Sequence, residues 1–292
     1  MRERSAFVVV GADSLVGGAL LKSLDRRGHQ AYGTTRRLAS LGTQRLFFDF
    51  EAAQAFKVPP DAGYAYVVAA ATNYDRCERD PKARVINEEL TPRAVAKLLS
   101  QGLFVTFIST NSVFGGDLPW PQEDSPHAPQ IPYAAQKSRA EEAVRTAARN
   151  LRAESRLNIV RLTKILSAST PPLPSWLAAW RRLEAVQPFA DLIFAPMSLK
   201  FVSEALAILG EKRVSGDLHL SGAENITYVD LAHALASRLN IQPDLVQPTT
   251  AAARGIHIPF KPRFSGLGMA RTTRLTGLSP QLLHQVVADI VS

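Results

Sequence analysis

Tyr133 and Lys137 could perform proton-transfer chemistry, because they lie four positions apart in a segment with helical character. On an α-helix, positions i and i+4 share a face, so the phenol and the ammonium can converge on one point. A neighbouring cation favours the phenolate and lowers the pKa of a tyrosine from about 10 towards neutrality. Such a tyrosine can donate or accept a proton in carbonyl and alcohol chemistry. Because many helices carry Tyr-x-x-x-Lys as a surface pair, the motif gains meaning only beside residues 109–114, which precede it.

The start of the chain predicts a strand, a turn and a helix that could bind a dinucleotide. Residues 7–10 form a short apolar run of the kind found in buried parallel strands, and residues 19–28 predict a helix that ends at Gly28. Gly11 permits a tight turn and Gly17 lets helix and strand pack closely, so that the helix N-terminus faces the pyrophosphate. The usual three-glycine spacing is incomplete, and an ordinary strand–turn–helix unit remains the alternative.

Alternating strands and helices then position these residues. Further strands are predicted at residues 30–34, 45–48, 64–68, 104–108 and 158–162, and helices at residues 81–101 and 134–155. This alternation predicts an α/β fold with a doubly wound, parallel Rossmann sheet over residues 1–165, whose ligands lie at the carboxyl ends of the strands.

Prolines become frequent after residue 165, and helices are predicted at residues 197–210 and 227–239. We expect residues 166–292 to form mainly a smaller C-terminal lobe that binds substrate beside the sheet, with the chain free to cross between the two parts.

Composition excludes several classes of protein. The net charge of +8 comes from scattered Lys and Arg with no basic block, which argues against nucleic-acid binding. No apolar run is long enough to span a membrane, and residues 1–5 lead directly into a strand, so we expect a cytoplasmic protein without a signal peptide. The single cysteine, Cys77, and six dispersed histidines give no metal-ligand spacing, so we predict no metal site.

A family resemblance rests on motifs in a fixed order along nearly the whole chain. They occupy residues 11–17, 69–72, 75–78, 87, 108–114, 133–137, 161–164 and 218–223. In this order they resemble the extended short-chain dehydrogenase/reductase family, and within it dTDP-4-dehydrorhamnose reductase and related sugar-nucleotide-binding proteins. The resemblance implies a nucleotide-sugar substrate and leaves a homodimer open.

The resemblance also implies catalytic roles. Thr110 takes the place of the Ser or Thr that hydrogen-bonds the substrate carbonyl, and Tyr133 that of the general acid. Lys137 would both lower the pKa of Tyr133 and hold the nicotinamide ribose.

Cofactor positions follow from the same resemblance. Backbone N–H groups near Ser14 would meet the pyrophosphate, Asp49 and Phe50 would flank adenine, and small residues from Ala69 onward would let the cofactor approach the backbone. The full set is Gly11, Ser14, Leu15, Val16, Gly17, Asp49, Phe50, Ala69, Ala70, Ala71, Thr72 and Asn87, with Tyr133 and Lys137. Asn87 could equally be an ordinary polar residue of its helix.

Arg36 and Arg37 favour NADP over NAD. They follow the second predicted strand, where no carboxylate is present to pair with a ribose 2′-hydroxyl. An arginine at this place accommodates a 2′-phosphate, although two adjacent arginines could also form a solvated face.

Two departures from the family pattern leave alternatives open. The family's Asp-Tyr after the catalytic Thr is Asn111-Ser112 here, so a tyrosine that contacts substrate is missing. We expect Thr110, Asn111 and Ser112 to contact substrate, together with Trp176 and Arg263 in the second half, where Trp180 is a further candidate. The resemblance favours reduction of the 4-keto group of a nucleotide-linked deoxysugar. The first alternative is an epimerase of the same family. A dehydratase ranks lower, because it needs an acidic pair beside the Thr. The third alternative is a non-catalytic subunit, such as the regulatory β subunit of methionine adenosyltransferase.

Overall fold

A seven-stranded parallel sheet forms the larger half of the protein. The computed structural model describes residues 5–292. The expectation that the first residues lead into a strand without a signal peptide concerns residues 1–4, which lie outside the described part. The sheet has the order β10-β6-β5-β4-β1-β2-β3. Its strands are β1 (Ala6–Val10), β2 (Ala31–Thr35), β3 (Arg45–Phe47), β4 (Ala62–Val67), β5 (Phe104–Thr110), β6 (Leu157–Leu162) and β10 (Gly216–Leu220). The order changes direction between β1 and β4, and this confirms the predicted doubly wound fold.

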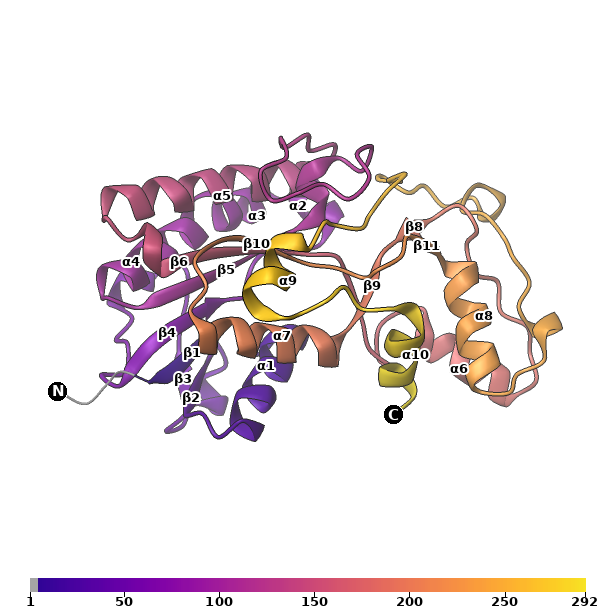
Figure 1. Ribbon diagram of the computed structural model, residues 1–292, viewed down its shortest axis with the longest axis horizontal. Coiled ribbons are helices and arrows are strands. Elements are labelled where there is room, and N and C mark those ends of the chain that lie inside the picture. Colours follow the sequence, from indigo (N-terminus) through magenta and orange to yellow (C-terminus); the bar gives the residue numbers. More distant parts are fainter. Residues whose placement is uncertain (1–4) are drawn as a thin grey trace.

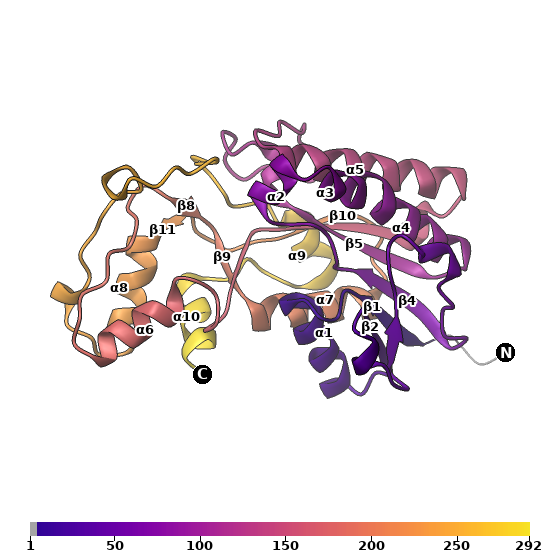
Figure 2. The ribbon, with the colours of Figure 1, turned by 180° about the vertical axis from the view of Figure 1, so that it is seen from behind.

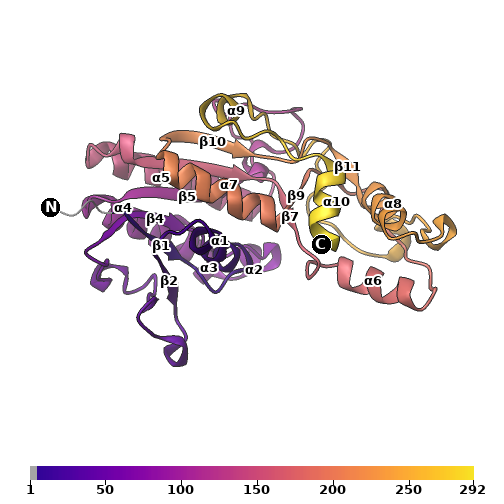
Figure 3. The ribbon, with the colours of Figure 1, turned by 60° about the horizontal axis from the view of Figure 1, so that its bottom comes forward.

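Helices cover both faces of this sheet (Figure 1). One layer contains α2 (Tyr74–Arg79), α3 (Pro81–Val85), α4 (Thr91–Ser100) and α5 (Pro132–Asn150). The other contains α1 (Leu15–Arg26) and α7 (Leu199–Lys212), which lie side by side in Figure 3. Buried aliphatic side chains fill the space on each face, including Val105 and Val144 on the first and Val9 and Leu206 on the second. Strands β1, β4 and β6 are buried throughout, which explains their largely apolar sequences.

The second half of the chain forms a smaller lobe beyond the carboxyl ends of the strands (Figure 2). It contains α6 (Leu173–Arg181), α8 (Tyr228–Arg238), α10 (Leu283–Val291) and the short antiparallel pair β8 (Ile193–Phe194) and β11 (Ile226–Thr227). Strands β7 (Lys164–Leu166) and β9 (Pro196–Ser198) pair between the two parts, and α9 (Ala270–Thr276) lies next to β10.

The chain crosses back to the sheet within this second half. Residues 197–210 were predicted as a helix of the smaller lobe, but α7 packs against α1 and leads into β10. Its buried row of small and aliphatic side chains, including Val202, Ala205 and Leu209, covers the face of the sheet opposite α5. The sequence marks this helix as amphipathic but not which apolar surface it covers.

Candidate active site

Thr110 and Tyr133 meet at the carboxyl end of the sheet. Thr110 is the last residue of β5, and Tyr133 lies in the first turn of α5, which Pro132 begins. Burial raises the pKa of Tyr133 above its ordinary value, and the nearby Thr110 side chain acts in the opposite direction with a smaller effect. Thr110 is 8% and Tyr133 9% exposed, so both lie just beneath the surface. The two side chains proposed as carbonyl-binding hydroxyl and proton donor thus lie near each other at this edge of the sheet.

Lys137 lies one turn further along the same buried face of α5. Its Nζ donates a hydrogen bond of 2.7 Å to the carbonyl oxygen of Ile108 and lies 4.0 Å from the centre of the Phe107 ring. Burial lowers the pKa of Lys137 to about 8, while the charge of Glu141 acts in the opposite direction. The expectation of a lowered Tyr133 pKa is wrong for this structure, because desolvation outweighs every other influence on the phenol.

A buried ionic network fixes this face of α5 to the sheet. Glu141, the next residue in the Tyr133–Lys137 row, accepts hydrogen bonds from Ser109 Oγ at 2.5 Å and from Arg161 Nη2 at 2.8 Å. Although burial opposes ionisation, Arg161 and Ser109 lower the pKa of Glu141 to about 2. The network thus ties α5 to β5 and β6, the strands beside the site. Sequence reasoning missed it, although the i+4 spacing from Lys137 was a usable signal.

The first turn has the geometry of a dinucleotide-binding loop. Gly11 has φ +95°, and a Cβ there would lie 2.7 Å from the backbone nitrogen of Ala69. The Gly11 N–H donates to Thr34 Oγ1 at 3.1 Å, and Ser14 Oγ caps α1 by accepting from the Gly17 N–H at 3.1 Å. The glycines thus bring the loop after β4 against the turn and leave the N-terminus of α1 open to an anion. Of the other residues predicted here, Leu15 is exposed and Val16 is half-buried.

Asn87 supports the loop after β4. It is 1% exposed and lies in a π-helical turn between α3 and α4. Its Oδ1 accepts from the Ala71 N–H and its Nδ2 donates to the Ala71 carbonyl oxygen, both at 2.9 Å. A third bond, of 2.8 Å, runs from Nδ2 to Gln136 Oε1 on α5. The side chain thus links the loop of Ala69, Ala70, Ala71 and Thr72 to the helix that carries Tyr133.

The end of β2 carries a cluster of charges. Arg36 and Arg37 are exposed directly after this strand, as the NADP expectation requires. Sequence reasoning missed Asp13, which accepts a 2.7 Å hydrogen bond from Thr35 Oγ1 and forms an ion pair with Arg45. The pKa of Asp13 is lowered, chiefly by that hydrogen bond, with Arg45 and Arg37 adding to the effect. Three arginines against one carboxylate leave the cluster positive, which suits a phosphate.

The residues predicted beside adenine separate in the structure. Asp49 lines a hollow after β3, together with Leu46, Phe47, Phe48, Ala52, Ala55, Phe56 and Lys57. Phe50 instead packs edge-on against Phe48, with ring centres 5.3 Å apart. The two side chains therefore do not flank one space, and only Asp49 faces the hollow.

A pocket between the two halves begins beside Thr110. Asn111 and Ser112 line it from the sheet side, and residues between 260 and 267 form the opposite wall. In Figure 1 this yellow-orange segment passes from the lobe towards α9. Asn111 Nδ2 donates to the carbonyl oxygen of Ser265 at 2.8 Å and to its Oγ at 2.9 Å. The amide of Asn111 therefore joins the two walls.

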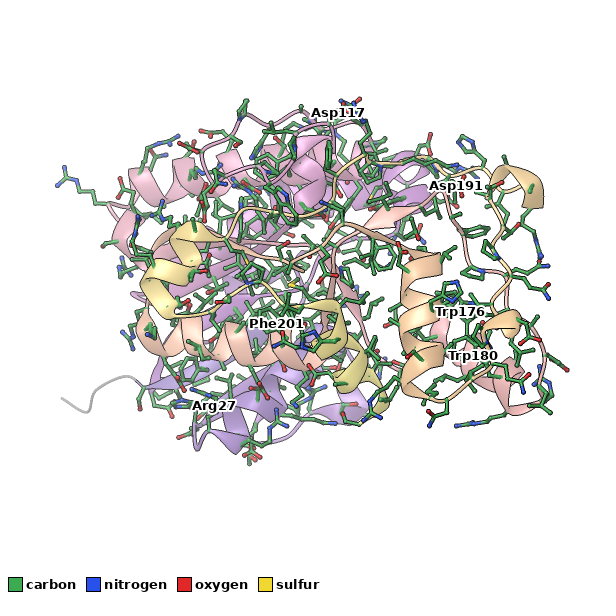
Figure 4. All side chains as sticks on the ribbon, turned by 45° about the vertical axis from the view of Figure 1, so that its right-hand side comes forward. Arg27, Asp117, Trp176, Trp180, Asp191 and Phe201 are labelled. Atoms are coloured by element: carbon green, nitrogen blue, oxygen red, sulfur yellow. The ribbon has the colours of Figure 1, made fainter. Side chains whose placement is uncertain are left out.

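Two predicted substrate contacts lie inside the lobe. Trp176 and Trp180 are 6% and 2% exposed, and their ring centres lie 6.2 Å apart in a core with Leu231 and Val286 (Figure 4). The i, i+4 spacing of the tryptophans places both on the inward face of α6. The structure thus gives them a packing role in place of the predicted contact. Arg263 is exposed and lies on the segment that forms the far wall of the pocket.

Within residues 5–292, no group of three or more His, Cys, Asp and Glu side chains is placed to hold a metal ion. None of the helices described there is long and apolar enough to cross a membrane.

Comparison with known proteins identifies the family. A family model described as "RmlD substrate binding domain" matches residues 5–292. The chain belongs to this family. Its members are NAD(P)-dependent reductases of the extended short-chain dehydrogenase/reductase type, so the implied family and enzyme class are confirmed.

Two relatives of this chain carry names of reductases that act on dTDP-linked sugars. The chain is 29% identical to a "Probable dTDP-4,6-dihydroxy-2-methyloxan-3-one 4-ketoreductase" of Streptomyces antibioticus, over 98% of this chain and 96% of that protein. It is also 29% identical to a dTDP-4-dehydrorhamnose reductase of Streptomyces griseus, over 95% and 90%.

A solved structure shares the fold. The dTDP-4-dehydrorhamnose reductase of Bacillus anthracis in complex with NADP has a TM-score of 0.80 at 20% identity, over 98% of this chain and 97% of that one.

Proposed function

We propose that this chain is an NADP-dependent reductase of the 4-keto group of a nucleotide-linked deoxysugar. The observation that carries the proposal is the proximity of Thr110 and Tyr133 at the carboxyl end of the sheet, beside a small pocket between the two halves. The names of the two Streptomyces relatives support the substrate class.

Each residue of the site has a separate task in this reaction. When bound, the cofactor supplies the hydride that reduces the keto carbon. The Thr110 hydroxyl donates a hydrogen bond to the substrate oxygen, where negative charge develops. Tyr133 gives its proton to that oxygen, and a raised pKa keeps the phenol protonated and ready to act as the acid. Lys137 and the Glu141–Arg161 network hold α5 so that the phenol stays beside Thr110.

The choice of NADP over NAD rests on the charge at the end of β2. Arg36 and Arg37 are exposed there, and the nearby carboxylate of Asp13 is bonded to Thr35 and Arg45 instead. Guanidinium groups bind phosphates in a fork geometry, so they suit a 2′-phosphate better than a hydroxyl.

A non-catalytic NADP-binding subunit is the second candidate. It is favoured by the burial of Thr110 and Tyr133 and by the apolar surroundings of Tyr133, which include Cys77, Ile131 and Phe260. A subunit of this kind would keep the cofactor site and need no path for a sugar to Tyr133.

Oxidation of NADPH distinguishes the two candidates. The full chain is incubated with NADPH and a panel of dTDP- and UDP-linked 4-keto-6-deoxysugars, and NADPH absorbance is followed. The reductase proposal expects saturable turnover with at least one member of the panel. Saturable NADPH binding without turnover of any member would refute the reductase and favour the non-catalytic subunit.

A further inference from the structure

Tyr74 covers the proposed proton donor. It is the first residue of α2, directly after the loop of residues 69–73. Its ring lies against the Tyr133 ring, with centres 5.3 Å apart and an angle of 32° between the planes. Tyr74 is 39% exposed whereas Tyr133 is 9% exposed, so Tyr74 presents the outer aromatic surface of the pair. Tyr74 is therefore the more accessible of the two rings and lies beside the proposed proton donor.

The Tyr74 side chain lies near Ser112, which lines the pocket between the halves. Burial raises the pKa of Tyr74, and Ser112 acts in the opposite direction with a smaller effect. Ser112 Oγ accepts a 3.2 Å hydrogen bond from Thr110 Oγ1. Tyr74 thus lies near a hydroxyl that is itself bonded to the proposed carbonyl-binding group.

The lobe approaches Tyr74 from the other side. The charge of Tyr74 contributes to the raised pKa of Tyr228, after burial, which is the main cause. Tyr228 begins α8 and packs on Phe194, with ring centres 4.4 Å apart. Tyr74 therefore lies against Tyr133 and within electrostatic range of Tyr228 in the lobe. A rigid ring with one hydroxyl at such a place combines apolar contact with a directional hydrogen bond.

We infer that Tyr74 determines specificity for the sugar, its ring packing on the sugar face and its hydroxyl hydrogen-bonding a sugar hydroxyl next to the reacting carbonyl. The inference rests on the proposed function and adds a contact to the same site. A site that hydrogen-bonds a substrate hydroxyl discriminates strongly against an analogue that lacks it, because its own polar group is then left without a partner.

The test compares two substrates in two variants. Tyr74→Phe keeps the ring and removes only the hydroxyl, and Tyr32→Phe is the matched control, because the Tyr32 hydroxyl bonds Asp61 outside the site. Each protein is assayed with a keto-sugar nucleotide that the wild type reduces and with its analogue lacking the hydroxyl next to the keto group. We expect Tyr74→Phe to lower kcat/KM about tenfold for the first substrate, the effect of one hydrogen bond, and to leave the analogue and the Kd for NADPH unchanged.

Each outcome decides one of the two proposals. An unchanged ratio of the two kcat/KM values in Tyr74→Phe, or an equal loss in Tyr32→Phe, overturns the role of Tyr74. If the wild type reduces no keto-sugar nucleotide, the proposed function fails, and calorimetric binding of a dTDP-sugar and its deoxy analogue then tests Tyr74 separately. In that case equal affinity of wild type and Tyr74→Phe for both ligands overturns the inference.

Discussion

Gly17 and Gly18 are adjacent in α1, yet the structure predicts opposite effects for the same substitution. A Cβ at Gly17 would lie 2.3 Å from the Gly11 carbonyl oxygen, 2.9 Å from its carbon and 3.0 Å from the Ala12 Cα. All three atoms belong to the backbone of the turn, so no side chain can rotate away. A Cβ at Gly18 would have the Ala12 carbonyl oxygen as its nearest atom, at 3.5 Å, which is ordinary van der Waals contact.

The magnitudes follow from these contacts. Gly17→Ala must move the start of α1 by about 1 Å from the turn, and overpacking of this kind costs about 1–3 kcal/mol of folding free energy. At this chain length, 1 kcal/mol corresponds to about 2 °C, so we expect Tm to fall by about 2–6 °C. The displaced helix N-terminus should also raise the Kd for NADPH about tenfold. Gly18→Ala removes backbone freedom from the unfolded chain and should raise Tm by about 1–2 °C.

Thermal unfolding followed by circular dichroism and NADPH titration followed by fluorescence measure both effects. If Gly17→Ala kept the stability and NADPH affinity of the wild type, the close approach of helix and turn would have no consequence, and this prediction would be refuted. An equal loss in Gly18→Ala would show that the start of α1 tolerates no added side chain at either position, and the contact with Gly11 would not be the cause.

Three further predictions concern chemistry and cofactor choice. Tyr133→Phe should lower turnover by about 10² or more and leave the Kd for NADPH nearly unchanged; near-parental turnover would exclude Tyr133 as the proton donor. Replacing Arg36 and Arg37 by Gln should weaken NADPH binding by about 1.5–3 kcal/mol and NADH binding much less; equal weakening of both cofactors would remove the basis for NADP. The pKa of Lys137 is about 8, so its ammonium is present below that pH and is lost above it. Because Lys137 is expected to hold the nicotinamide ribose, the affinity for NADPH, measured by titration, should fall as pH rises through 8. Lys137→Arg should remove this fall, because arginine stays charged. A flat wild-type profile would contradict this.

The sequence was sufficient for six of the seven strands of the sheet and for the order of the site along the chain, but β10 was not predicted. Mainly apolar segments at residues 7–10 and 104–108 identified parallel strands, because strands buried on both faces carry no alternation. Tyr133 and Lys137 could be placed on one face because helical periodicity is a local property of the backbone. The glycine turn of residues 11–17 could be predicted for the same reason.

Long-range contacts decided the rest. The sequence could not indicate that α7 covers the sheet, that Asp13 lies beside the end of β2, or that desolvation outweighs the influence of Lys137 on the Tyr133 pKa. Each depends on which surfaces pack together. Trp176 and Trp180 show the same limit, since i, i+4 spacing gives them a shared face but not the neighbour of that face. The contact between Tyr74 and Tyr133 could be seen only in the folded structure, because 59 positions separate the two residues in the sequence. Burial and electrostatics depend on atoms that the chain brings together from distant positions.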